Sequence, residues 1–96
     1  MEERPLLLSV LTPGGEICSV RCASVRFSVP DGKDGKIPGG SVGIRRGHAD
    51  ALMVVAPGKI EGFADGRVIL TCRVDGGLAM IGDNRVSVLT NRAETG

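Results

Sequence analysis

Aromatic side chains are nearly absent from this chain of 96 residues: Phe27 and Phe63 are the only two, and there is no Trp or Tyr. Modules that bind single-stranded nucleic acid stack the bases on aromatic rings, so this class of function has little support. Val, Ile, Leu and Met must fill the core instead. A chain of this length buries only about 60 to 65% of the surface that it exposes when unfolded, which favours one domain over residues 1–96 with a thin, two-layer core.

The chain also lacks an excess of charge of one sign, and it has a single histidine. Twelve Lys and Arg residues are balanced by eleven Asp and Glu residues, so no global field concentrates nucleic acid or an acidic substrate. An enzyme of this size needs a nucleophile, a base and a cleft, and His48, near Asp50, is the only candidate base. A structural His48, packed or hydrogen-bonded to backbone in a turn, is favoured. We predict no catalytic residue and no enzyme activity.

Signals for metals, cofactors and membrane spans are missing as well. The cysteines, Cys18, Cys22 and Cys72, form an odd set without a CxxC spacing, and with His48 they do not have the spacing of a zinc site. No phosphate-binding Gly-x-x-x-x-Gly-Lys-Ser/Thr loop, signal peptide or apolar run of about 18 residues occurs. We therefore expect no metal, no cofactor, a reduced cytosolic compartment, and burial of at least one cysteine as a small hydrophobic residue.

What the chain does have is glycine and short apolar runs. Fifteen glycines weaken any helix by about 1 kcal/mol each, and no window of useful length has the 3.6-residue period. Turn signals instead separate nine strand candidates at roughly hairpin spacing. The sequence therefore predicts an all-β fold, an antiparallel β-sandwich or flattened barrel of about nine or ten short strands. The candidates are Leu6–Leu11, Ile17–Val20, Cys22–Val29, Val42–Ile44, Ala51–Val55, Lys59–Phe63, Arg67–Val74, Leu78–Ile81 and Arg85–Leu89.

Two of these strands alternate clearly enough to predict their faces. In residues 22–29 one face carries Ala23, Val25, Phe27 and Val29, and the other face carries Cys22 and polar residues. In residues 67–74 we expect Val68, Leu70, Cys72 and Val74 to point inward, and Ile69 to interrupt the polar outer face. An exposed apolar residue such as Ile69 suits a contact with a partner. Residues 30–40 have no pattern, and we predict a mobile surface loop there.

The segment from Gly39 to Leu52 resembles a family signature, Gly-Glu-Phe-Gly-Val-Leu-Pro-Gly-His-Ala-Pro. This signature belongs to the N-terminal β-sandwich domain of the epsilon subunit of rotary ATP synthases. Further matches occur in family order over roughly residues 6–93: Val10-Leu11-Thr12-Pro13, Pro57-Gly58-Lys59-Ile60, Asp75-Gly76-Gly77 and Val86-Ser87-Val88-Leu89. The chain is similar to a short form of the subunit without the C-terminal helical hairpin, a segment that is either naturally missing or truncated in this sequence.

The resemblance implies a non-catalytic central-stalk subunit. It implies a rotor component that couples the gamma subunit to the ring of c subunits during proton- or sodium-driven ATP synthesis. It also implies a peripheral position on the cytoplasmic face of the bacterial cell membrane, with membrane contact only through the c-ring. No nucleic-acid partner is expected, and the isolated chain is expected to be a monomer.

Carried over by position, the expected contacts fall into two groups. The segment expected to approach the ring and the stalk contains Ser41, Val42, Ile44, Arg45, Arg46 and His48. Ser41 replaces a usual acidic residue and Arg46 a usual Pro, so the local charge is reversed and the facing ring loops should carry acids; simple solvation of these side chains is the alternative. Ile69 and Met80 are the candidates for the gamma-facing flank, although an ordinary core position is favoured for Met80.

If the resemblance is left aside, two other functions fit the regular spacing of strands and turns. A small ligand-binding jelly roll or barrel would show a deep pocket lined by polar groups. An SH3-like or OB-type nucleic-acid module would need a clustered basic face, whereas the twelve basic residues here are spread along the chain and alternate with acids.

Overall fold

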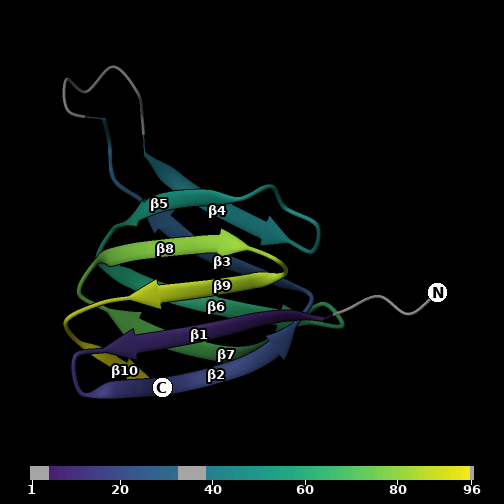
Figure 1. Ribbon diagram of the computed structural model, residues 1–96, viewed down its shortest axis with the longest axis horizontal. Coiled ribbons are helices and arrows are strands. Elements are labelled where there is room, and N and C mark those ends of the chain that lie inside the picture. Colours follow the sequence, from purple (N-terminus) through teal and green to yellow (C-terminus); the bar gives the residue numbers. More distant parts are fainter. Residues whose placement is uncertain (1–4, 33–38, 96) are drawn as a thin grey trace.

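The described residues form two five-stranded sheets packed face to face. The computed structural model describes residues 5–32 and 39–95, and no helix occurs among them. In sheet A the strand order is β2-β1-β9-β8-β5, and in sheet B it is β10-β7-β6-β3-β4. Figure 1 shows sheet A in front of sheet B. The strands are β1 (Leu6–Thr12), β2 (Gly15–Cys22), β3 (Ser24–Val29), β4 (Gly40–Arg45), β5 (Ala51–Val55), β6 (Gly58–Ala64), β7 (Arg67–Val74), β8 (Gly77–Gly82), β9 (Arg85–Leu89) and β10 (Ala93–Thr95).

The predicted sandwich is confirmed, and every predicted strand is present to within two residues of its bounds. One short strand, β10, was not predicted; it pairs with β7 at the edge of sheet B. Most neighbouring strands are antiparallel, but β1 and β9 are parallel. This pair joins the two ends of the chain, with Leu8 beside Val86 and Val10 beside Val88.

The core lies between the sheets and is aliphatic, as the lack of aromatics requires. Phe27 is its only aromatic member, and Leu8, Ile44 and Ile60 are completely buried with it. Phe63 stays half-buried, with the Arg26 guanidinium carbon 5.2 Å from the centre of its ring. Because inward residues generally alternate with outward ones along a strand, each sheet contributes one face to this core.

The predicted strand Cys22–Val29 is wrong at its beginning. Cys22 ends β2 in sheet A and is buried, and Ser24 begins β3 in sheet B. Ala23 is therefore an exposed corner residue and not an inward one, and its N–H donates to the Phe63 carbonyl at 2.7 Å. Apolar and polar residues continue to alternate along the sequence across this corner. The set of positions that faces the core changes there, because the chain passes from one sheet to the other.

The inward prediction for Val68 is also wrong, because a β-bulge interrupts β7. Gly62 pairs with Leu70 whereas Phe63 pairs with Val68, so Ile69 is an extra residue in the ladder. The bulge resets the alternation on its far side. Val68 is consequently 46% exposed, and Ile69 is exposed beside it. Cys72 and Val74, which lie on the other side of the shift, are buried as predicted.

The predicted loop over residues 30–40 lies partly outside the described residues, which omit 33–38. At its base, the Gly39 N–H donates to an Asp31 side-chain oxygen at 2.6 Å. The Asp65-Gly66 hairpin is confirmed: both residues have left-handed φ angles, 54° and 73°, as a two-residue turn of the type favoured between twisted strands requires.

Candidate functional site

Sheet A has an outer surface that is apolar over three strands. Leu52 and Val54 of β5 are 66% and 54% exposed, Leu78 and Met80 of β8 are 41% and 47% exposed, and Leu89 of β9 is 39% exposed. We call these five residues the β5–β8–β9 face. Single exposed aliphatic residues are common on soluble proteins, but a contiguous group of them marks a site for a partner.

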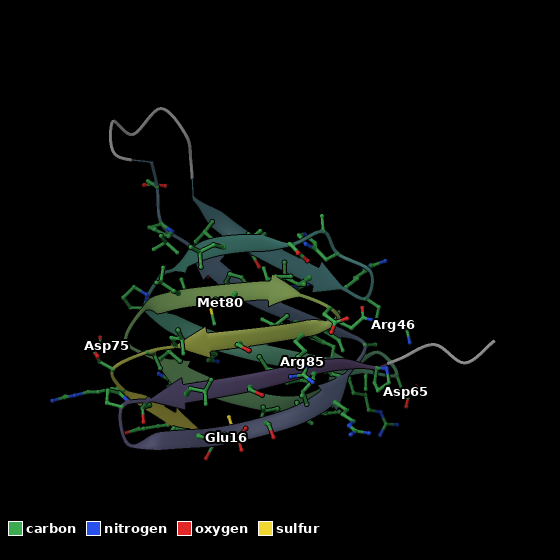
Figure 2. All side chains as sticks on the ribbon, viewed as in Figure 1. Glu16, Arg46, Asp65, Asp75, Met80 and Arg85 are labelled. Atoms are coloured by element: carbon green, nitrogen blue, oxygen red, sulfur yellow. The ribbon has the colours of Figure 1, made fainter. Side chains whose placement is uncertain are left out.

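Strand register makes this face contiguous. Leu52 lies opposite Met80, Val54 lies opposite Leu78, and Leu78 also lies opposite Leu89. Residues directly opposite on one face of an antiparallel pair have their Cβ atoms about 4.5 to 5.5 Å apart. The five side chains therefore form one patch, whose position on β8 is marked by Met80 in Figure 2.

A groove of about 700 Å³ runs along one end of the face. Its apolar lining includes Leu52 and Met80, with Ala51 and Ile81 beside them, and its polar residues are Asp50, Asp83, Arg85 and Ser87. Gly82 has no side chain, and the Asp50 carboxylate lies close to the place that a Cβ of Gly82 would take, with Oδ1 2.8 Å from it. An apolar floor with charged residues at its margin is the usual composition of a protein interface.

The outer surface of sheet B is different in character. Its exposed positions include Arg26, Arg45 and Arg73, and Glu61 lies opposite Arg26 in the register of β3 and β6. Among the described residues of β7, the exposed apolar side chains are Val68 and Ile69, which lie near the bulge. The larger group of exposed apolar side chains therefore lies on sheet A.

The two residues predicted for a gamma-facing flank do not lie together. Ile69 is on the outer surface of sheet B, and Met80 is on the outer surface of sheet A. The favoured core position of Met80 is wrong, because Met80 lies between two inward residues of β8, Ala79 and Ile81, both buried, and so points outward. The structure therefore separates this predicted pair and gives Met80 different neighbours.

Most of the segment predicted to approach the ring is on the surface. Ser41 and Arg45 are exposed at the two ends of β4, and Val42 is half-buried against the core. Ile44 is 0% exposed and packs in the core. Its place among the contact residues is therefore corrected: alternation points Ile44 inward, where no partner reaches it.

The turn after β4 carries Arg46 and His48, both exposed. The His48 N–H donates to the Arg45 carbonyl at 3.2 Å, and the His48 Nδ1 lies 2.6 Å from the Ala49 carbonyl oxygen. The predicted structural histidine, bonded to backbone in a turn, is confirmed. The Gly47 N–H donates to the Asn84 Oδ1 at 2.8 Å, which ties this turn to the β8–β9 hairpin.

Sequence reasoning missed Leu52, Val54, Leu78 and Leu89. A signal for them was present, because Ala51–Val55 is apolar at every position and Leu78–Ile81 is as well. Strands that read as continuous apolar runs are usually covered on both faces. In the described residues the inner face of β5 and β8 is covered by the core, and the outer face is bare.

No metal centre emerges from the described part of the chain, where no three His, Cys, Asp or Glu side chains gather at ligand distance. No helix capable of crossing a membrane is found in residues 5–32 and 39–95.

Residues 5–96 match the family described as ATP synthase, Delta/Epsilon chain, beta-sandwich domain. The chain belongs to this family. Among curated relatives, the ATP synthase epsilon chain of Synechococcus sp. is 44% identical over 57 residues, covering 59% of this chain and 41% of the relative. The chloroplastic ATP synthase epsilon chain of Daucus carota is 33% identical over 91 residues, covering 95% of this chain and 62% of the relative. The chain thus spans about half the length of these two relatives.

Solved structures share the fold of this chain. A chain of the Euglena gracilis mitochondrial ATP synthase OSCP/F1/c-ring structure superposes with a TM-score of 0.71 at 19% identity, covering 99% of this chain and 56% of that one. A chain of the Tetrahymena thermophila mitochondrial ATP synthase central stalk/c-ring structure gives a TM-score of 0.65 at 15% identity, covering 98% and 69%. Because the chain belongs to this family, we prefer the family's role to the ligand-binding and nucleic-acid-binding functions that the spacing of the strands alone would also allow.

Proposed function

We propose that this chain is an accessory subunit of a rotary ATP synthase that joins the gamma subunit to the c-ring in the central stalk. Family membership over residues 5–96 carries the proposal, and the structural neighbours come from F1/c-ring and central stalk/c-ring assemblies. In this role the chain performs no chemistry. It lies at the membrane surface, on the cytoplasmic face of a bacterial membrane, and reaches the membrane only through the ring.

The β5–β8–β9 face is the surface that we assign to the gamma subunit. Transmitting torque requires a contact that does not slip, and burial of aliphatic area supplies about 25 cal/mol per Å² removed from water. The five side chains stand on paired strands of a packed sandwich, so they lose little conformational freedom on binding. The polar outer surface of sheet B offers no comparable area among the described residues.

We assign the ring contact to the exposed residues of the β4 segment, Ser41, Arg45, Arg46 and His48, with half-buried Val42 beside them. Arg45 and Arg46 place positive charge where the family commonly has none. Complementary acidic side chains on the polar loops of the ring would orient the docking. A basic loop in the c subunit of the same organism would contradict this assignment.

The gamma assignment is tested by placing a charge on either broad face. Leu52→Glu and Met80→Glu each bury a carboxylate in the proposed contact, and each is expected to weaken binding to the purified gamma subunit at least tenfold. Ile69→Glu is the matched control, since Ile69 is as exposed as Met80 but lies on sheet B. Affinity is measured by calorimetry after circular dichroism has shown that all three variants are folded.

Three results would count against the proposal. Wild-type protein that does not bind gamma would remove it. Equal losses for Ile69→Glu and Met80→Glu would mean that the face is wrongly chosen. Full affinity in both sheet A variants would place the contact elsewhere.

A further inference from the structure

Two cysteines from different sheets meet at the edge of the sandwich where β2 and β10 face each other. Cys18 lies on β2, the edge strand of sheet A, and is half-buried against the core. Cys72 lies on β7 beside β10 and is completely buried. All three cysteines of the chain are free thiols. Neither Cys18 nor Cys72 belongs to the proposed contact surfaces, so any chemistry of this pair is independent of the proposed function.

The arrangement of the strands accounts for the meeting. A Cβ built on Gly62 of β6 would lie 3.4 Å from a Val20 methyl carbon and 3.7 Å from the Cys22 sulfur, so this part of β2 crosses β6 at Gly62. Gly62 pairs with Leu70 of β7. On β2, the next core-facing residue before Val20 is Cys18. On β7, the next core-facing residue after Leu70 is Cys72. Since β2 and β7 run in opposite directions in Figure 1, going backward along β2 and forward along β7 leads toward the same end of the sandwich. Cys18 and Cys72 therefore lie at that end together.

The Cys18 thiol responds to this contact. The pKa of Cys18 is raised from 9.0 to about 11, mainly by burial, and in part by the charge and a hydrogen bond of the neighbouring Cys72 side chain and by the charge of Glu16. The thiol is therefore protonated at neutral pH and reacts slowly, since the thiolate is the nucleophile in disulfide exchange.

We propose that Cys18 and Cys72 form a redox site in which oxidation by a small-molecule disulfide joins the two sheets covalently. Cys18, the accessible partner, loses its proton and attacks one sulfur of the oxidant, which releases one thiol and leaves a mixed disulfide. Cys72 then loses its proton and displaces the second thiol from Cys18. The balance is two protein thiols and one disulfide converted into one protein disulfide and two thiols. Two electrons pass from the protein to the oxidant.

Cys22 is not part of this site. It is buried beyond Val20, next to Gly62 and the corner at Ala23. A bond between Cys18 and Cys22 would have to join two residues four apart on one extended strand, about 13 Å along its axis, whereas the Cα atoms of a disulfide are usually about 4.4 to 6.8 Å apart. Two-layer β-sandwiches accept a bond between sheets, as immunoglobulin domains show.

The disulfide would lock the edge of the sandwich. It closes a loop of more than 50 residues, which restricts the unfolded chain strongly, and it fixes β2 to the part of β7 that pairs with β10. The expected change is a rise in Tm of about 5 °C or more for the oxidised chain, reversed by dithiothreitol.

The test incubates the reduced chain with oxidised glutathione at pH 9, traps the remaining thiols, and maps the peptides by mass spectrometry. Trypsin separates the three cysteines, because Arg21, Arg26, Arg67 and Arg73 provide cleavage sites between and beside them. The expected product is a linked pair containing Cys18 and Cys72. Its initial rate of formation should rise about tenfold per pH unit between pH 8 and 10, as expected for a thiol whose pKa lies above that range.

Two variants keep the outcome decisive. Cys22→Ala should still form the bond and show the rise in Tm, and Cys18→Ser should show neither. A product that contains Cys22, or oxidation that occurs only when urea unfolds the chain, would overturn the site. A Cys18–Cys72 product with an unchanged or lower Tm would overturn the covalent lock.

Discussion

At the scale of single residues, the backbone angle and the approach of a neighbouring strand decide which glycine positions tolerate a side chain. Gly77 begins β8 with a φ of +152°, and a Cβ placed there would overlap the carbonyl of Leu89 on β9. Gly43 on β4 has nothing within 4 Å of the same position. Both glycines lie in strands, so their difference comes from local geometry and not from element type.

Gly77→Ala is therefore expected to lower the free energy of unfolding by about 2 kcal/mol or more, because the strand must shift away from Leu89. Gly43→Ala should change it by less than about 0.5 kcal/mol, or stabilise slightly by restricting the unfolded chain. Urea unfolding of both variants checks this prediction. Similar losses in the two would mean that the close approach at Gly77 is relieved at little cost.

At the scale of elements, one side chain joins two turns that are distant in sequence. Asn84, in the β8–β9 hairpin, accepts a hydrogen bond from the Gly47 N–H at 2.8 Å and has a φ of +57°. Asn84 thus contributes in two ways. It adopts a left-handed backbone conformation, which Gly adopts as well, and it supplies a side-chain hydrogen-bond acceptor, which Gly lacks. The turn that carries Arg46 and His48 depends on this acceptor.

Asn84→Gly keeps the backbone conformation and removes the acceptor, so the Gly47 amide should exchange its hydrogen about fivefold faster, the effect of one net hydrogen bond near 1 kcal/mol. Asn84→Asp retains a carboxylate oxygen and is the control, with exchange within about twofold of wild type. Exchange measured by NMR gives both rates. Unchanged exchange in Asn84→Gly would show that the turn is held by other contacts.

Elements were predictable where the signal is local. Alternation and the Asp65-Gly66 turn located the strands, because side-chain period and turn angles depend on a few consecutive residues. Ala23 and Val68 were assigned to the wrong face because a change of sheet and a β-bulge alter the face without altering the sequence pattern. The parallel pairing of β1 with β9 connects segments about 80 residues apart, and no local pattern specifies such a partner.

At the scale of the whole molecule, stability depends on how the two sheets close on each other, and Cys18 reports on this closure. Its pKa is about 11 in the folded chain against an ordinary 9.0, so the folded state holds the proton more tightly than the unfolded state does. Between pH 9 and 11 the unfolded chain has therefore lost this proton and the folded chain has not. Folding stability must fall as pH rises through this window.

The reduced wild-type chain is accordingly expected to lose stability from pH 9 to pH 11, and Cys18→Ala should lose less over the same range. Cys22, whose pKa is also raised by burial, remains in both proteins and contributes equally. Urea unfolding under dithiothreitol at pH 8, 9.5 and 11 compares the two. Parallel curves would contradict the assignment of the alkaline loss to Cys18.

The sequence by itself determined the fold class, the family and most strand positions, because these depend on side-chain period, turn residues and the order of short motifs. The segment containing Gly47 and His48 was recognisable for the same reason. Only the tertiary structure decided that Ile44 is buried, that Met80 and Leu52 share an exposed face, and that Cys18 meets Cys72. Those facts depend on which strands become neighbours and how the sheets cross, and such contacts are set by packing between residues far apart in the chain.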